Sequence, residues 1–179
     1  MSNALEELIA SGYKARKERQ PEQAKEIFSE AVRLSRNAAD PLLLAGSLTG
    51  LGQIERDLDN NIAALQHYRE AVGILKGESK RLRFAHTIRH LADILREGGS
   101  FAEAAGCYEE ALRVYREHTE TPALDLANAL RGFALLKAGM GEAERANSLW
   151  HEARSLYELV NVQSGVEESE RHIARLKVK

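Results

Sequence analysis

Apolar residues recur along the chain at helical spacing, and one short pattern occurs four times. An alanine is followed by an aromatic residue four positions later and by a second alanine three positions after that. The four copies are Ala24, Phe28, Ala31; Ala64, Tyr68, Ala71; Ala104, Tyr108, Ala111; and Ala146, Trp150, Ala153. They begin 40, 40 and 42 residues apart, a regularity that is typical of stacked helical units.

A second pattern precedes each copy and predicts another helix. A leucine or isoleucine is followed, three and four positions later, by a pair that ends in glycine or alanine. The pairs are Ser11-Gly12 after Leu8, Leu51-Gly52 after Leu48, Leu91-Ala92 after Ile88, and Phe133-Ala134 after Leu130. Because small residues allow two helices to approach closely, the two patterns together predict four helical hairpins.

This order of residues resembles the tetratricopeptide repeat family over nearly the whole chain. The period of 40 to 42 residues is longer than the family's usual 34, and the proline after the second helix is missing. The longer period and the phrase DLANALRGFALL at 125–136 look like kinesin light chain repeats. The resemblance implies an all-α fold, a right-handed α-α superhelix in the form of a solenoid, which binds other proteins.

We expect one domain over 1–179, made of four repeats and a closing helix. The repeats are expected at about 3–38, 41–78, 79–120 and 122–161, and the capping helix at 165–177. Asp40-Pro41 and Thr121-Pro122 each read as a helix N-cap followed by proline at the first helical position. The apolar residues of the last helix share one face, so it can cover the fourth hairpin and still face water.

Composition narrows the classes of function. The 179 residues are 44% hydrophobic and carry a net charge of -2, so the chain has no long-range field that would gather nucleic acid. Its start carries acids instead of a basic leader, and no run of eighteen apolar residues occurs, so we expect a cytoplasmic protein without membrane partners. The single cysteine, Cys107, excludes an internal disulfide and fits a reducing compartment.

In a stack of such hairpins the first helices line the concave wall, so a ligand is expected there. In the third unit the helix around Ile88 has an apolar stripe on one side and charged residues opposite. Arginine also recurs at equivalent positions of the repeats, at Arg16, Arg56 and Arg96 and again at Arg89 and Arg131. The predicted ligand-binding residues are Arg56, His86, Arg89, Asp93, Arg96, Asn128, Arg131 and Leu135.

Arginine favours an anionic ligand, because its planar fork binds carboxylates and phosphates in pairs of hydrogen bonds. Between Lys80 and Arg96 the chain has five Lys or Arg and one acid. We therefore expect a protein or peptide partner with acidic or phosphorylated groups. Three alternatives stay open: an ordinary solvated face, a self-associating scaffold, or a receptor for a small anion at His86, Arg89, His90 and Asp93.

Catalysis and metal binding are not expected. His86 and His90 are four positions apart on one helix, but the intervening glutamate of a zinc protease motif is missing and arginines surround them. Cys107 stands beside Tyr108 with no histidine placed by a motif to activate its thiol. The sequence therefore predicts a binding module without a cofactor, a metal or an active site.

Overall fold

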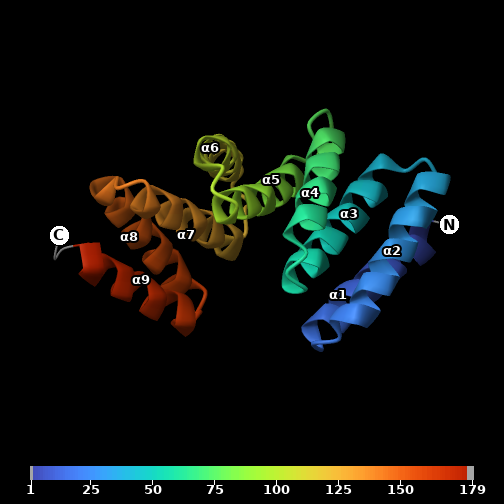
Figure 1. The fold of residues 1–179 in the computed structure, drawn as a ribbon, viewed down its shortest axis with the longest axis horizontal. Coiled ribbons are helices and arrows are strands. Elements are labelled where there is room, and N and C mark those ends of the chain that lie inside the picture. Colours follow the sequence, from blue (N-terminus) through green and yellow to red (C-terminus); the bar gives the residue numbers. More distant parts are fainter. Residues whose placement is uncertain (1, 177–179) are drawn as a thin grey trace. The chain divides into compact units, whose positions relative to one another are not determined.

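The computed structural model describes residues 2–176, which form nine α-helices and no strand. The helices are α1 (Ser2–Lys17), α2 (Pro21–Asn37), α3 (Pro41–Asp57), α4 (Asn61–Leu75), α5 (Arg81–Glu97), α6 (Phe101–Glu117), α7 (Ala123–Gly139), α8 (Ala143–Leu159) and α9 (Gln163–Leu176) (Figure 1). The predicted all-α repeat fold is confirmed. By its internal contacts the chain divides into two compact units, Met1–Ile94 and Leu95–Lys179.

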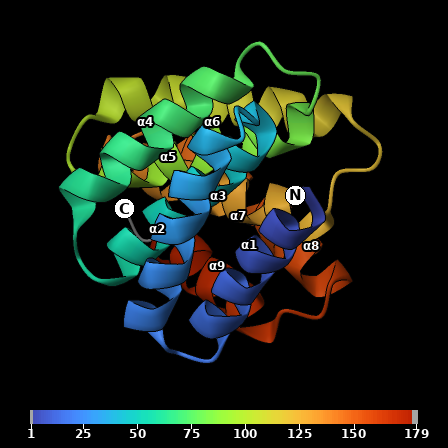
Figure 2. The same ribbon diagram turned by 90° about the vertical axis from the view of Figure 1, so that its right-hand side faces the viewer.

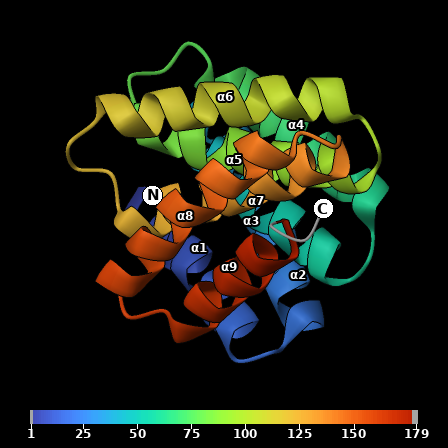
Figure 3. The same cartoon turned by 90° about the vertical axis from the view of Figure 1, so that its left-hand side faces the viewer.

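The first unit holds the hairpins α1–α2 and α3–α4 and most of α5. Helices α1 and α2 lie side by side, and α3 packs against α1, α2 and α4 (Figure 2). In the second unit α7 packs against α6 and α8, and α8 packs against α9 (Figure 3). Within each unit, helices that are neighbours along the chain thus pack against one another.

The repeated aromatic residues form the centre of each hairpin. Phe28, Tyr68, Tyr108 and Trp150 all have 0% exposed surface, as do the alanines of the same pattern. A Cβ atom built on Gly12 would lie 2.9 Å from the ring of Phe28, and one on Gly52 would lie 2.8 Å from the ring of Tyr68. The small residue of the first helix therefore lets the aromatic ring of the second helix press against its backbone, as the pattern predicts.

The same turn ends the first helix of all four hairpins. Its left-handed residue is Arg19, Asp59, Gly99 or Gly141, in each case five positions before the first alanine of the pattern. The next amide donates to the carbonyl five residues back, for example Ser100 N to Leu95 O at 2.8 Å and Asn60 N to Glu55 O at 2.7 Å. This is the Schellman arrangement, which satisfies carbonyls that the helix end leaves without a partner.

One of the two predicted caps is wrong. The carboxylate of Asp40 accepts from the amide of Leu43 at 3.0 Å, so it caps α3 as predicted. Helix α7 instead begins at Ala123, and the hydroxyl of Thr121 donates to the carbonyl of Tyr115 at 2.8 Å. The hydroxyl bonds instead to a carbonyl in the last turn of α6, because the carbonyls at a helix end lack an amide donor from their own helix.

Helix α9 lies in the register of a first helix. The ring of His172 stacks on Trp150 with centroids 4.4 Å apart and planes 7° apart, and His90 of α5 stacks on Tyr68 at 5.5 Å and the same angle. In both pairs the histidine follows the aromatic residue by 22 positions. Where α3 and α5 bury Leu48 and Ile88, however, α9 carries an exposed glutamate, Glu170.

Candidate functional site

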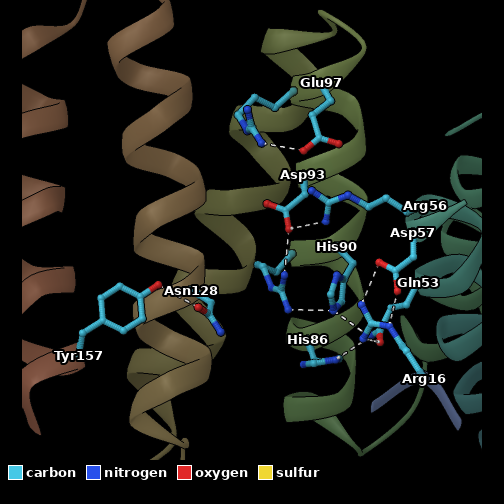
Figure 4. Close-up of polar contacts among 12 residues, drawn as sticks. Arg16, Gln53, Arg56, Asp57, His86, His90, Asp93, Glu97, Asn128 and Tyr157 are labelled. Atoms are coloured by element: carbon cyan, nitrogen blue, oxygen red, sulfur yellow. Dashed lines mark hydrogen bonds and ion pairs between the residues drawn. The ribbon is translucent and has the colours of Figure 1, made fainter. Parts of the chain in front are cut away.

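Polar side chains from α1, α3 and α5 meet in the first unit (Figure 4). We call this group the polar cluster; its members are Arg16, Gln53, Arg56, Asp57, His86, Arg89, His90 and Asp93. Four of them lie within the predicted binding set. Consecutive first helices thus contact one another through hydrogen bonds and ion pairs.

One run of hydrogen bonds crosses all three helices. Arg16 donates to Asp57 through Nε at 2.6 Å, and its Nη1 donates to Gln53 Oε1 at 2.6 Å. Because a guanidinium can only donate, this bond fixes the Gln53 amide with its NH₂ group turned the other way. That NH₂ group donates to His90 Nε2 at 2.9 Å and lies 3.4 Å from His86 Nε2.

His90 is held in one protonation state by its neighbours. Its Nε2 atom faces two donors, the Gln53 amide and Arg89 Nη2 at 2.8 Å, so Nε2 accepts and the ring proton lies on Nδ1. Burial, and after it the adjacent Arg89 guanidinium, hold the pKa of His90 well below its usual range. The occupied lone pair and 7% exposure leave His90 unable to serve as a general base for a substrate.

Two guanidinium groups share one carboxylate at the next step along α5. Arg89 Nη1 lies 2.8 Å from Asp93 Oδ2, and Arg56 Nη1 lies 3.5 Å from the same oxygen. Arg89 and Asp93 are 8% and 7% exposed, whereas Arg56 and His86 are half-buried. A buried charge needs such a partner, because its removal from water is costly.

The charged side of α5 is therefore less open than the sequence pattern suggests. The side chains of Arg89 and Asp93 are buried and not on a solvated face, and Arg56 of α3 contacts the carboxylate of Asp93. Sequence reasoning also missed Asp57 as the partner of Arg16 and His90 as the acceptor at the centre. A spacing of 41 positions separates Arg16 from Asp57 and 37 separates Arg56 from Asp93, so a search for opposite charges one repeat apart would find both pairs.

In the second unit the predicted residues contact other parts of that unit. Arg131 donates to Glu168 of α9 through Nε at 2.6 Å and Nη2 at 2.8 Å, and Asn128 accepts from the hydroxyl of Tyr157 at 2.8 Å. Burial alone would raise the pKa of Glu168, but the hydrogen bonds and the positive charge of Arg131, with smaller contributions from His172 and Arg171, together outweigh burial and lower that pKa.

The two remaining predicted residues take different positions. Arg96 forms an ion pair with Glu97 at 2.9 Å, and Leu135 is half-buried on α7. The sequence-based assignment of all these residues to a ligand site stays a prediction.

In residues 2–176 no three His, Cys, Asp or Glu side chains gather in a way that could hold a metal ion. Over the same range, no helix has both the length and the apolar content needed to cross a bilayer.

Comparisons with known proteins point in one direction. Residues 84–120 match the family model described as tetratricopeptide repeat. Over 128 residues the chain is 29% identical to "Regulatory protein RapG" of Bacillus subtilis (strain 168), which covers 71% of this chain. The chain spans only 34% of the length of that relative.

Two solved structures share the fold. A crystal structure of BtubC (BKLC) from P. vanneervenii has a TM-score of 0.72 at 17% identity, covering 97% of this chain and 79% of that one. The second is a crystal structure of the nearly identical TPR-like repeats of a putative kinesin light chain from Podosopora anserina. Its TM-score is 0.76 at 14% identity, and the match covers 97% of this chain and 84% of that one.

Proposed function

Because the chain belongs to the tetratricopeptide-repeat family, as the sequence pattern predicts, we propose that it is a non-catalytic module that binds a segment of another protein. The binding surface lies on the first helices α1, α3 and α5, around the exposed edge of the polar cluster. The preferred segment carries acidic side chains. The name of the relative from Bacillus subtilis, a regulatory protein, agrees with a regulatory role for the proposed binding.

The observation that carries the proposal is the unequal charge of the polar cluster. It contains three guanidinium groups, those of Arg16, Arg56 and Arg89, and two carboxylates, those of Asp57 and Asp93. His90 is held neutral, so it does not alter this balance. A cluster with one more cation than anion attracts a further carboxylate more strongly than a neutral group.

Arg56 is the cation best placed to meet such a carboxylate. Its side chain is 29% exposed, against 10% for Arg89, and its distance to the shared Asp93 oxygen is 3.5 Å against 2.8 Å. A longer, more exposed ion pair is weaker and exchanges more readily. His86, half-buried on the neighbouring α5, adds a ring nitrogen beside the Gln53 amide.

The surface beside the cluster also offers apolar contact. Tyr13 of α1 is 37% exposed, with its ring edge-on to Phe28 at 5.0 Å. On α3, a Cβ atom added to Gly46 would meet nothing within 4 Å, so a side chain of the partner has room there. An aromatic anchor next to a charged group is a common combination at sites that bind peptides.

The proposal is tested by titrating a fluorescein-labelled peptide rich in Asp and Glu, and its Asn and Gln counterpart, into the unaltered chain and two variants. Arg56→Gln is expected to weaken binding of the acidic peptide about tenfold, equivalent to ~1.4 kcal/mol. Arg36→Gln is the matched control, because Arg36 forms a similar ion pair with Glu70 at 2.7 Å on the second helices. Fluorescence anisotropy gives the affinities.

Two results would contradict the proposal. Equal affinity for the acidic and neutral peptides would remove the preference for acids, and equal losses in the two variants would remove the assignment to the first helices. Either result leaves the fold and the family unchanged.

A further inference from the structure

A second candidate site lies far along the chain from the polar cluster, within the second unit. Helices α6, α7 and α8 enclose an open pocket of about 370 Å³. Small-molecule sites in proteins usually span roughly 300–1,000 Å³, so this pocket has room for a small ligand or for one or two side chains. Its floor is formed by the buried side chains of Leu112 and Phe133.

Arginines outnumber glutamates among the residues that line this pocket. The lining contains three arginines, Arg113 and Arg116 of α6 and Arg145 of α8, and two glutamates of α6. Arg113 pairs with Glu117 at 3.0 Å and more loosely with Glu110 at 3.9 Å, and Arg116 pairs with Glu152 at 2.7 Å. Within residues 2–176 no ion pair is seen for Arg145, whose side chain is exposed at the start of α8.

The repeat itself shows which of these arginines the fold requires. Arg36 of α2 pairs with Glu70 of α4, just as Arg116 of α6 pairs with Glu152 of α8, so this pair recurs between equivalent second helices. The position equivalent to Arg145 in α4 is Ala63. The second hairpin therefore packs without a cation at this position, so the fold alone does not explain Arg145.

We propose that the pocket between α6 and α8 binds a phosphate monoester, with Arg145 as the residue that selects it. A phosphate dianion can bond to several guanidinium groups at once, which a single carboxylate does less well. The pair between Arg113 and Glu117 is more than half exposed on both sides, so a dianion can draw Arg113 from it. Arg116 stays with Glu152 and forms the wall.

The test uses the full chain and two probes: free O-phosphoserine, and a nine-residue peptide with one phosphoserine. Titration calorimetry is expected to show saturable binding at a single site and at least a tenfold loss for Arg145→Ala. This variant should fold, because alanine already stands at the equivalent position of α4. Arg33→Ala is the matched control, since Arg33 is the equivalent of Arg113 in the first unit, and it should bind as the unaltered chain does.

The two probes identify the source of the phosphate. Equal affinities assign the pocket to a small phosphate ester, and tighter binding of the peptide assigns it to a phosphorylated segment of a partner protein. The proposal is overturned if Arg145→Ala binds as well as the unaltered chain, if Arg33→Ala loses as much, or if the unphosphorylated peptide binds equally. It is also overturned if neither probe saturates the unaltered chain at about 10 mM, since even a weak specific site has a Kd near 1 mM.

Discussion

The recurring arginines have a structural explanation at the scale of single residues. Arg16 and Arg56 each form an ion pair with a carboxylate on the next first helix, at Asp57 and Asp93, whereas the equivalent Arg96 pairs with Glu97 of its own helix. In the second series Arg131 pairs with Glu168 of α9, whereas Arg89 pairs with Asp93 of its own helix. Arg36 and Arg116 each pair with a carboxylate on the next second helix. A contact between helices that recurs in two repeats produces the same sequence signal as a binding belt. Recurrence at equivalent positions therefore cannot by itself separate a ligand site from a link between repeats.

Buried His90 gives the chain a specific dependence of stability on pH. Its folded pKa is lowered, first by burial and then by Arg89, so below about pH 6.5 the unfolded chain binds a proton that the folded chain does not. The stabilisation is fully present above pH 6.5 and is lost as the pH falls toward the folded pKa. The lowered pKa values of His67 and His172 act in the same direction.

We expect the free energy of unfolding, measured by urea denaturation, to fall by up to ~1.4 kcal/mol per pH unit for each such histidine between about pH 6.5 and 5. His90→Leu should be less stable overall, because Gln53 and Arg89 lose their acceptor, yet its stability should depend less on pH. His151→Gln, altered at an exposed side chain, is the control. Equal pH slopes for the unaltered chain and His90→Leu would rule out the assignment to His90.

The centre of the polar cluster could not be predicted from the sequence. The position of His90 on a helix next to Arg89 is visible in the chain, but its role depends on Gln53, 37 positions earlier. The direction of the Gln53 amide depends in turn on Arg16. These hydrogen bonds join three helices, so they can be identified only once the positions of all three helices are known.

At the scale of helices, the turn inside each hairpin requires one residue with positive φ, and only two of the four repeats have glycine there. The left-handed position holds Arg19, Asp59, Gly99 and Gly141. An L side chain in this conformation costs roughly 1–2 kcal/mol, and glycine avoids that cost. The sequence signal is therefore visible in the third and fourth hairpins and hidden in the first two.

Two alanine substitutions in neighbouring parts of the third hairpin should have opposite effects. Gly99→Ala is expected to lower the free energy of unfolding by about 1–2 kcal/mol, because φ at this position is +80°. Gly106→Ala, inside α6 and with nothing within 4 Å of the added Cβ, should raise it by about 0.5–1 kcal/mol. Thermal unfolding of both variants gives the signs, and a gain for Gly99→Ala would contradict the turn geometry.

The helices and their pairing into hairpins were predictable because the residues that determine them lie within one hairpin. The alanine and aromatic pattern, and the small residue facing it, are set by contacts such as that between Gly52 and Tyr68 within one hairpin. The role of Thr121 was not predictable, because its hydroxyl donates to the carbonyl of Tyr115 in the preceding helix instead of capping α7. Local patterns fix elements well and fix the choice between competing hydrogen bonds poorly.

At the scale of the whole molecule, contacts between neighbouring helices dominate, so damage should stay local. Leu48→Ala removes a side chain with 0% exposure from the first unit and should cost about 2–5 kcal/mol there. In arrays whose repeats contact only their neighbours, such a loss spreads weakly. Hydrogen exchange should quicken in α1 to α4 more than in α8 and α9, and Leu130→Ala should give the reverse pattern. Uniform quickening in both variants would mean that the chain unfolds as one cooperative body.

The register of α9 offers a route to building longer arrays from this chain. His172 stacks on Trp150 as His90 stacks on Tyr68, so α9 and α5 take the same register against the preceding second helix. The obstacle to grafting a further hairpin is chemical, because Glu167 and Glu170 stand where α5 has Ala85 and Ile88. Replacing those two glutamates with alanine and isoleucine would give α9 the apolar surface that α5 offers to a following helix.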